Sequence, residues 1–366
     1  MPTEKIKSIG KTEEAFDTIV IGGGQAGLAA GYFLMQQGAN FIILDEHPRT
    51  GDSWRKRWDD LKLFTPGKFN GLPGLPFPKP ADHFPDKDEV ADYLEGYALR
   101  FNLPIRRGVK VSSLTRDNQA FRIDTGKAVL SARNVIIASG PFQTPFIPAF
   151  SNELDPSIHH FHSSEYRNPQ QVQSQSVLVV GAGNSGAEIA LELVKAGKRV
   201  WLAGRDVGRI PANGPLGQFL GGYPIWWFMS HVLTVNTPIG RKVRSGEFHH
   251  GTPLGRATRR EIIAAGVELT QRVSGIHDGK PQLEDGRILP VEGVVWATGF
   301  RPDYRWIDLP VFDEQGYPRH SQGVVPDAPG LYFIGLFFQR ALNSSLLGGV
   351  GADVAYIASQ VARHVN

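Results

Sequence analysis

Two glycine-rich turns constrain this 366-residue chain more than any other feature of its sequence. The turns at residues 22–27 (GGGQAG) and 181–186 (GAGNSG) each follow an apolar run and open a helical pattern. Glycines at these spacings let the backbone turn tightly and approach a pyrophosphate, whose charge then lies at the N-terminus of the next helix. Because both turns share this context, the sequence predicts two dinucleotide sites. The turn residues expected to contact a cofactor are Gly22, Gly24, Gln25, Ala26, Gly27, Gly181, Gly183, Asn184, Ser185 and Gly186.

The residue that ends the second strand of each unit distinguishes the two cofactors. Asp45 follows the apolar run 41–44, 23 positions after the first turn begins, and its carboxylate can accept hydrogen bonds from a ribose diol. That pattern is typical of FAD or NAD. The same offset in the second unit reaches Gly204, and the next residue is Arg205, whose guanidinium can pair with a 2′-phosphate. We therefore expect FAD in the first site and NADPH in the second.

Composition and charge favour a soluble enzyme of about two domains. The formal net charge is only +3 and the basic residues are scattered, so we expect no nucleic-acid partner. The chain has no cysteine, which excludes a dithiol relay and thiolate metal sites. His159, His160 and His162 lie close together without further ligands, so we expect no metal. The polar first residues lack a signal-peptide pattern, and the predicted location is the cytoplasm.

An uncharged segment, residues 211–240, contains a dense aromatic run at 219–229. Gly221, Gly222 and Pro224 interrupt any continuous helix there, so we expect no membrane span. Three interpretations stay open: packing between domains, the wall of a substrate tunnel, or a weak contact with a membrane surface.

Two further strands resemble each other and suggest how the domains connect. The runs 134–137 and 293–296 end in Ala138-Ser139-Gly140 and Ala297-Thr298-Gly299, and prolines follow both. A buried strand that ends in small residues lets the chain leave the sheet close to a bound nucleotide and cross to another domain.

The predicted fold is therefore α/β, with two Rossmann-like domains and the NADPH domain inserted into the FAD domain. We expect a discontinuous FAD domain at residues 1–168 and 300–366, and an NADPH domain at 169–299. The last element, 351–365, has an apolar helical face, and the glycines before it could aim its dipole at the flavin.

The order of motifs resembles that of class B flavin-dependent monooxygenases, a group that includes flavin-containing monooxygenases, YUCCA-type plant enzymes and Baeyer–Villiger monooxygenases. The resemblance runs from about residue 16 to 362 and is strongest to the short bacterial and YUCCA-like members. Pro156 and Ile158 stand where the family fingerprint has Phe-x-Gly. The motifs are the two glycine turns, Gly51-Asp52-Ser53-Trp54-Arg55, His162-Ser163-Ser164-Glu165-Tyr166 and Ala297-Thr298-Gly299-Phe300.

The resemblance implies roles for residues outside the two turns. The Gly-x-x-Trp segment would lie along the flavin, and the segment at His162 would belong to the signature that joins the two nucleotide domains. Phe64 and Trp54 are expected to contact the flavin, with Arg340 or Asn343 on its far side; Phe64 and Asn343 are the candidate catalytic residues. The remaining expected cofactor contacts are Glu46, Ser53, Val111, Ser139, His162, Ala297, Thr298 and Gly299.

The reaction that the resemblance implies is oxygenation of a small organic molecule. NADPH would reduce FAD, O2 would add to give a C4a-(hydro)peroxyflavin, and one oxygen atom would pass to a sulfide or amine, or to a ketone in a Baeyer–Villiger oxidation. Three alternatives stay open: an NAD(P)H:acceptor reductase, an oxidase that releases peroxide, and a nucleotide-holding redox sensor. A homodimer is also left open.

Overall fold

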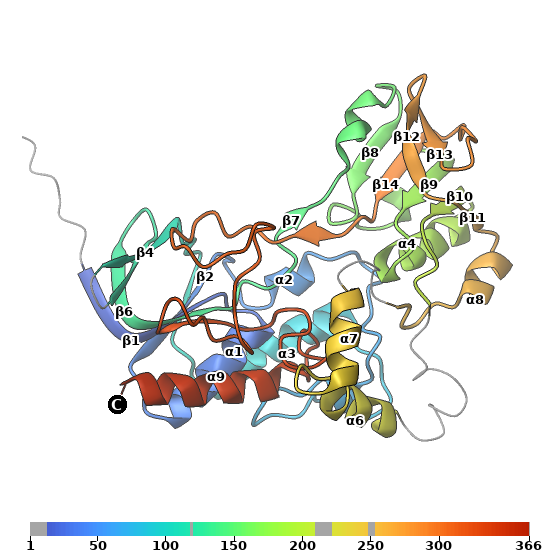
Figure 1. Ribbon diagram of the computed structural model, residues 1–366. Coiled ribbons are helices and arrows are strands. Elements are labelled where there is room, and N and C mark those ends of the chain that lie inside the picture. The colour runs from blue at the N-terminus through green and yellow to red at the C-terminus, as the bar shows by residue number, and fades with distance from the viewer. Residues whose placement is uncertain (1–12, 118–119, 209–221, 248–252, 366) are drawn as a thin grey trace, which may run out of the picture.

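Two separate sheets organise the chain. The computed structural model describes residues 13–117, 120–208, 222–247 and 253–365, and Figure 1 shows one sheet in each of two bodies joined by a narrow connection. The first sheet has seven strands in the order β3-β2-β1-β6-β5-β4, with β16 pairing β6. Its strands are β1 (Glu13–Ile21), β2 (Phe41–Asp45), β3 (Ile105–Arg107), β4 (Ser113–Asp117), β5 (Ala120–Asp124), β6 (Val129–Ile137) and β16 (Leu331–Phe333).

Helices cover one face of the first sheet. The strands β3, β2, β1, β6 and β16 run parallel, which buries apolar side chains on both faces. Val20, Ile43 and Ile136 point to the same face and pack against the helices there. These helices are α1 (Gln25–Gln36), α3 (Lys87–Arg100) and α9 (Val350–Val365), the last of which matches the helix expected at the end of the chain.

The second sheet has five parallel strands in the order β11-β10-β9-β14-β8. Trp201 and Trp296 are fully buried between this sheet and the hairpin β12·β13. The helices α4 (Asn184–Lys195) and α8 (Arg259–Ala264) pack on the other face. The strands of this body are β8 (His159–His162), β9 (Ser176–Val180), β10 (Arg199–Ala203), β11 (Glu268–Thr270), β12 (Val273–His277), β13 (Lys280–Leu283) and β14 (Gly293–Trp296).

This architecture confirms the expected α/β fold with two dinucleotide-type sheets. The boundaries of the domains stay a proposal, and strand pairing refines one of them. β8 pairs with β14 in the second sheet, although it precedes the expected start of that domain at residue 169. We therefore place the start before His159.

The two crossings that follow β6 and β14 run through one small ribbon. β7 (Thr144–Pro145) pairs antiparallel with β15 (Phe300–Arg301), and Figure 1 shows this pair between the two bodies. The Phe146 backbone N–H donates to the Gly299 carbonyl at 2.9 Å, and the Thr298 hydroxyl donates to the Phe146 carbonyl. The two segments with similar sequences, after β6 and after β14, thus lie side by side.

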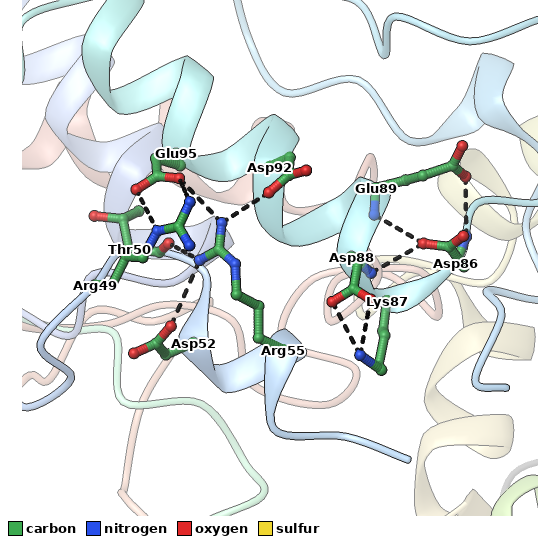
Figure 2. Close-up of polar contacts among 10 residues, drawn as sticks. All are labelled: Arg49, Thr50, Asp52, Arg55, Asp86, Lys87, Asp88, Glu89, Asp92 and Glu95. Carbon is green, nitrogen blue, oxygen red and sulfur yellow. Dashed lines mark hydrogen bonds and ion pairs between the residues drawn. The ribbon is translucent and has the colours of Figure 1, made fainter. Parts of the chain in front are cut away.

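Residues 52–86, between β2 and α3, form a long segment that packs over α3. This stretch is called the wrapping segment below. It begins with α2 (Asp52–Arg55), and Figure 2 shows how ion pairs fix α2 on α3. Arg55 reaches Asp92 at 2.9 Å and Glu95 at 3.0 Å, and Glu95 also binds Arg49. A capping box then starts α3: Asp86 accepts from two N–H groups of the first turn, and Glu89 accepts from the Asp86 N–H. The short 3-10 turns of the chain are Gly67–Phe69, Ala149–Glu153 and Pro169–Gln171.

The aromatic segment returns to the first body although it lies between strands of the second. α6 (Tyr223–His231) begins after Gly222, which has φ +73°, with Pro224 in its first turn; α7 (Pro238–Glu247) follows. The turn between them pairs with the loop before α9, because the Val235 N–H donates to the Arg340 carbonyl at 2.9 Å. The rest of the run, residues 209–221, lies outside the described residues. None of the described helices combines the length and apolar character needed to span a bilayer.

Two half-buried glutamates lie on α4. The Glu192 carboxylate accepts hydrogen bonds from Trp58 Nε1 and from the Tyr166 hydroxyl, both at 3.0 Å, so it links α4 to the segment after α2. Glu188, one turn earlier, lies 3.8 Å from Arg256. Burial raises the pKa of each glutamate to about 7.

These raised pKa values predict a pH-dependent stability. Between about pH 4.5 and 7 the folded protein binds more protons at Glu188 than the unfolded chain does, so this residue's contribution to stability falls as the pH rises. Relative to the wild type, Glu188→Gln should gain about 1–3 kcal/mol in unfolding free energy between pH 5 and pH 8. Denaturant unfolding at both pH values measures this change. The exposed Glu268→Gln is the control, and an equal response of the two variants would contradict the prediction.

Candidate functional site

The glycines of the first turn have two different duties. Gly22 has φ +112°, and a Cβ there would lie 2.5 Å from the Ala138 carbonyl oxygen. A Cβ on Gly27 would overlap the Gly22 carbonyl oxygen. Gly24, in contrast, has φ −79°, and a Cβ on it would meet no atom within 4 Å. Gly22 and Gly27 are therefore required by the chain itself, whereas Gly24 leaves space in front of the turn.

The second turn repeats this division. Gly181 has φ +113°, and a Cβ there would lie 2.7 Å from the Ala297 carbonyl carbon, while one on Gly186 would overlap the Gly181 carbonyl. Gly183 has φ −76°, and a Cβ on it would again meet nothing within 4 Å.

Free backbone donors face the space at both turns. Gly24 and Gly183 are the N-caps of α1 and α4, so no side chain caps either helix, and neither first turn carries an acidic residue. The first N–H groups of each helix are thus available to an anion, at the end where the helix dipole favours negative charge. The open space and the free donors fit the pyrophosphates of FAD and NADP(H).

Asp45 lies against the first turn. Its carboxylate accepts from the His47 N–H at 2.9 Å and sits where a side chain on Gly23 would be. Burial raises the pKa of Asp45, and hydrogen bonds from the His47 and Gly23 backbones oppose that rise. A buried acceptor is therefore held beside the turn, where it could bind a ribose diol.

The second turn excludes such a carboxylate on steric grounds. Ala182 stands in the place of Gly23, and a Cβ on Gly204 would lie 2.6 Å from the Ala182 nitrogen and 2.8 Å from its Cβ. The small and the larger residue are therefore interchanged between the two units. Gly23 faces Asp45 in the first, and Ala182 faces Gly204 in the second. Arg205, next to Gly204, is exposed and has no hydrogen bond or ion pair among the described residues, which leaves its guanidinium free for a phosphate.

His162 joins the end of β8 to the crossing. Its ring is fully buried, its Nε2–H donates to the Gly299 carbonyl at 2.9 Å, and Nδ1 accepts from the Ser164 N–H at 3.1 Å. Burial lowers its pKa, so the ring stays neutral at neutral pH. Because both nitrogens are engaged, His162 positions the Gly299 turn and has no free nitrogen for proton transfer.

The other residues expected from the resemblance lie in several environments. Trp54 is half-buried on the core beneath α1 and α3, and Ser53 is exposed beside it. The Val111 side chain is packed in the core on the other face of the first sheet. Ser139 is exposed and accepts from the Gln143 amide at 3.0 Å, and Glu46 is exposed next to Asp45.

Two polar side chains of the turns brace neighbouring loops. Gln25 donates from its amide to the Ser345 carbonyl at 3.0 Å, which fixes the loop before α9 on the first turn. The Asn184 amide donates to the Pro253 carbonyl and accepts from the Gly255 N–H at 2.8 Å. The hydrogen bonds of these two side chains are therefore made within the chain. Ser185 is half-buried, and the Ala26 methyl packs on Gly335.

The two candidate catalytic residues and Arg340 also contact the chain itself. Phe64 packs on Gly255, so the wrapping segment touches the loop that Asn184 holds. Asn343 is buried, and its amide donates to Ser230 of α6 at 2.8 Å. Arg340 donates to the Ala352 carbonyl at 2.7 Å, at the start of α9. No direct contact brings these three side chains together, and their proposed position around the flavin stays a prediction.

A pocket of about 370 Å³ opens between the wrapping segment and α6. Trp226 of α6 stacks on Phe69 at 4.8 Å, and Gly348, just before α9, also lines the pocket. The buried Asn70 amide, which donates to the Thr65 and Pro66 carbonyls, shapes this wall. Sequence reasoning missed the pocket and Asn70, because only the turn-like residues around Pro66 and Gly67 mark the site.

Comparison with known proteins places the chain in a family. The model of the pyridine nucleotide-disulphide oxidoreductase family matches residues 19–212. An uncharacterized CzcO-like oxidoreductase of Geobacillus kaustophilus is 40% identical over 95% of this chain and 99% of its own length. Indole-3-pyruvate monooxygenase YUCCA1 of Oryza sativa is 34% identical over 94% of this chain and 90% of its own. A flavin-containing monooxygenase from Stenotrophomonas maltophilia superposes with a TM-score of 0.78 at 24% identity, over 96% of this chain and 100% of its own.

The fold and the two glycine turns, each at the N-terminus of a helix, define a flavoprotein oxidoreductase with two dinucleotide sites. The chain belongs to the pyridine nucleotide-disulphide oxidoreductase family, and its resemblance to class B flavin-dependent monooxygenases is confirmed. Its cofactors are FAD and NADP(H). Among the residues that the structure describes, no group of three acidic or histidine side chains is arranged to hold a metal ion.

The open space at the two middle glycines predicts separable losses of cofactor. A valine at position 24 has room in the protein and an allowed φ, but it would occupy the space of the pyrophosphate. Gly24→Val should therefore fold and be colourless, whereas the wild type should carry about one FAD per chain. Gly183→Val, the matched control, should stay yellow and lose NADPH binding. Flavin absorbance and NADPH titration measure both effects, and a yellow Gly24→Val protein would contradict the assignment.

Arg205 is expected to set the preference for NADPH. Arg205→Ala removes a charge-assisted contact with the 2′-phosphate, so the KM for NADPH should rise about 10- to 100-fold while the KM for NADH changes little. Steady-state kinetics with both nucleotides tests this. An unchanged ratio would show that another group binds the phosphate.

This interchange of residues suggests a variant that gains a preference for NADH, beyond the loss of NADPH affinity expected of Arg205→Ala. Ala182→Gly combined with Gly204→Asp restores in the second unit the pair seen at Gly23 and Asp45. With Arg205→Ala added, the variant should prefer NADH. Gly204→Asp alone is the control, because Ala182 would obstruct its side chain and lower the affinity for both nucleotides.

Proposed function

We propose that the protein is an NADPH-driven, FAD-dependent monooxygenase that inserts one atom of O2 into a small organic substrate. Sulfides and amines are the first candidate substrates and ketones the next. The observation that carries this proposal is that two different dinucleotide turns lie next to the same ribbon, β7·β15. Ala138, after β6, touches Gly22 of the first turn, and Ala297, after β14, touches Gly181 of the second. A cytoplasmic location and a homodimer stay predictions.

The bound flavin and nicotinamide supply the electron transfer and the activation of O2. The chain supplies binding and orientation. Gly24 and the N-terminus of α1 would hold the FAD pyrophosphate, with Asp45 on its ribose; Gly183 and α4 would hold NADPH, with Arg205 on its 2′-phosphate. His162 keeps the Gly299 turn in place. Oxygen transfer to sulfur or nitrogen needs no acid–base pair from the protein, which agrees with the neutral, fully bonded state of this histidine.

The pocket beside α6 is the proposed substrate site. Its walls include Phe69, Leu72, Phe77 and Trp226, which suit a flat apolar or aromatic molecule. Gly348 of its lining belongs to the loop that Gln25 fixes on the first turn, which supports a position of the pocket near the FAD site. The name of the rice relative states an aromatic substrate, indole-3-pyruvate, which supports a small aromatic molecule here as well.

Oxygen balance distinguishes this function from its rivals. With NADPH, O2 and an aryl thioether, we expect sulfoxide to form with consumption of NADPH and O2, and peroxide release to fall when the thioether is present. An oxidase would convert all the O2 to peroxide with or without thioether, and a reductase would need another acceptor. Mass spectrometry of the product with ¹⁸O2 shows the origin of the oxygen. Failure to oxygenate sulfides, amines and ketones would contradict the proposal.

Trp226 provides the site-specific test. Trp226→Ala removes the stacked wall, so the KM for the aryl thioether should rise about tenfold. Its FAD content and its KM for NADPH should match the wild type. An unchanged KM for the thioether would place the substrate elsewhere.

A further inference from the structure

The exposed face of α6 is unusual for a helix of a soluble body. The helix has nine residues, no acidic or basic side chain except His231, and no buried residue. Tyr223, Trp227 and Phe228 are 60%, 57% and 43% exposed. Clustered large aromatic side chains that stay in contact with water usually mark an interaction surface.

The inner face of α6 is already occupied, which fixes what the outer face presents. Trp226 stacks on Phe69 with an angle of 9° between the rings, and Ser230 accepts from the buried Asn343 amide. These contacts orient the helix on the first body. Trp227 and Phe228 therefore lie on a surface that no described part of the chain covers.

Two exposed cations lie on the helix that follows this aromatic surface. α7 follows α6 after a short turn, and a Cβ on its Gly240 would overlap the Thr234 backbone, so the two helices form one unit. Arg241 and Lys242 of α7 are exposed, as is Ile239. Lys68 lies 5.3 Å from the Tyr223 ring and is paired with the exposed Asp82. The sequence from 207 to 246 contains no acidic residue.

We propose that this surface, formed by Tyr223, Trp227, Phe228, Ile239, Arg241 and Lys242, binds the surface of an anionic lipid bilayer. Aromatic rings with polar edges favour the headgroup region, and exposed cations favour anionic lipids. A helix of nine residues is too short to cross a bilayer, so the contact is peripheral. A second copy of the chain fits less well, because a two-fold contact would bring the same cations together.

Vesicle flotation of the full-length, FAD-loaded protein tests the proposal. We expect binding to phosphatidylcholine vesicles that contain phosphatidylserine, weaker binding without it, and loss of binding at high salt. Trp227→Ser with Phe228→Ser should lower the bound fraction at least about tenfold. Arg241→Gln with Lys242→Gln should abolish the dependence on phosphatidylserine. Ile263→Ser, on the exposed apolar position of α8, is the matched control and should bind like the wild type.

The variants should keep the FAD content and NADPH oxidation of the wild type, since none of the substituted residues lies at a cofactor turn or in the pocket. The result is thus independent of whether the oxygenation proposal holds. Absence of binding at low salt, or equal binding of the aromatic variant and the wild type, would overturn the membrane assignment. A dimer in sedimentation that the aromatic substitutions dissolve would also overturn it, and would give the surface to a second copy.

Discussion

One backbone contact, made once in each body, organises the molecule. The Ala138 N–H donates to the Ile21 carbonyl at 2.8 Å, and its own carbonyl fills the place of a side chain on Gly22. Ala297 makes the same pair of contacts with Val180 and Gly181. The end of each crossing strand is thereby locked against a dinucleotide turn. A glycine at positions 22 and 181 is a steric requirement of this contact, and the ribbon β7·β15 begins a few residues beyond it.

Local sequence was sufficient for the parts of the fold that depend on local geometry. The two turns, the strands around them, the paired crossings and α9 follow from glycine spacing, apolar runs and helical periodicity. Sequence could not place β8 in the second sheet or return α6 and α7 to the first body, because those positions depend on contacts between distant segments. The hydrogen bond from Trp58 to Glu192 joins residues 134 positions apart. A glutamate in a helix gives no local sign of that partner.

The candidate site shows the same limit at the level of side chains. The middle glycines could be identified from spacing, and the structure adds the reason, namely open space at Gly24 and Gly183 against crowding at their neighbours. Gln25 and Asn184 lie in the expected turns, but the amide of each donates a hydrogen bond to a loop carbonyl. Spacing predicts where a residue lies on the backbone. The direction of its side chain depends on loops that arrive from elsewhere in the chain.

The two bodies are joined by a short ribbon and by side-chain contacts beside it. The ribbon has two residues in each strand, which is too little pairing to hold an orientation by itself. Contacts beside it, such as Trp58 on Glu192 and Phe64 on Gly255, also join the two bodies. Glu192 has a pKa of about 7, so near neutral pH its donors, Trp58 and Tyr166, face a carboxylate that exchanges its proton. The link from Trp58 to Glu192 is therefore sensitive to pH, since the indole N–H binds a charged carboxylate more tightly than a neutral one.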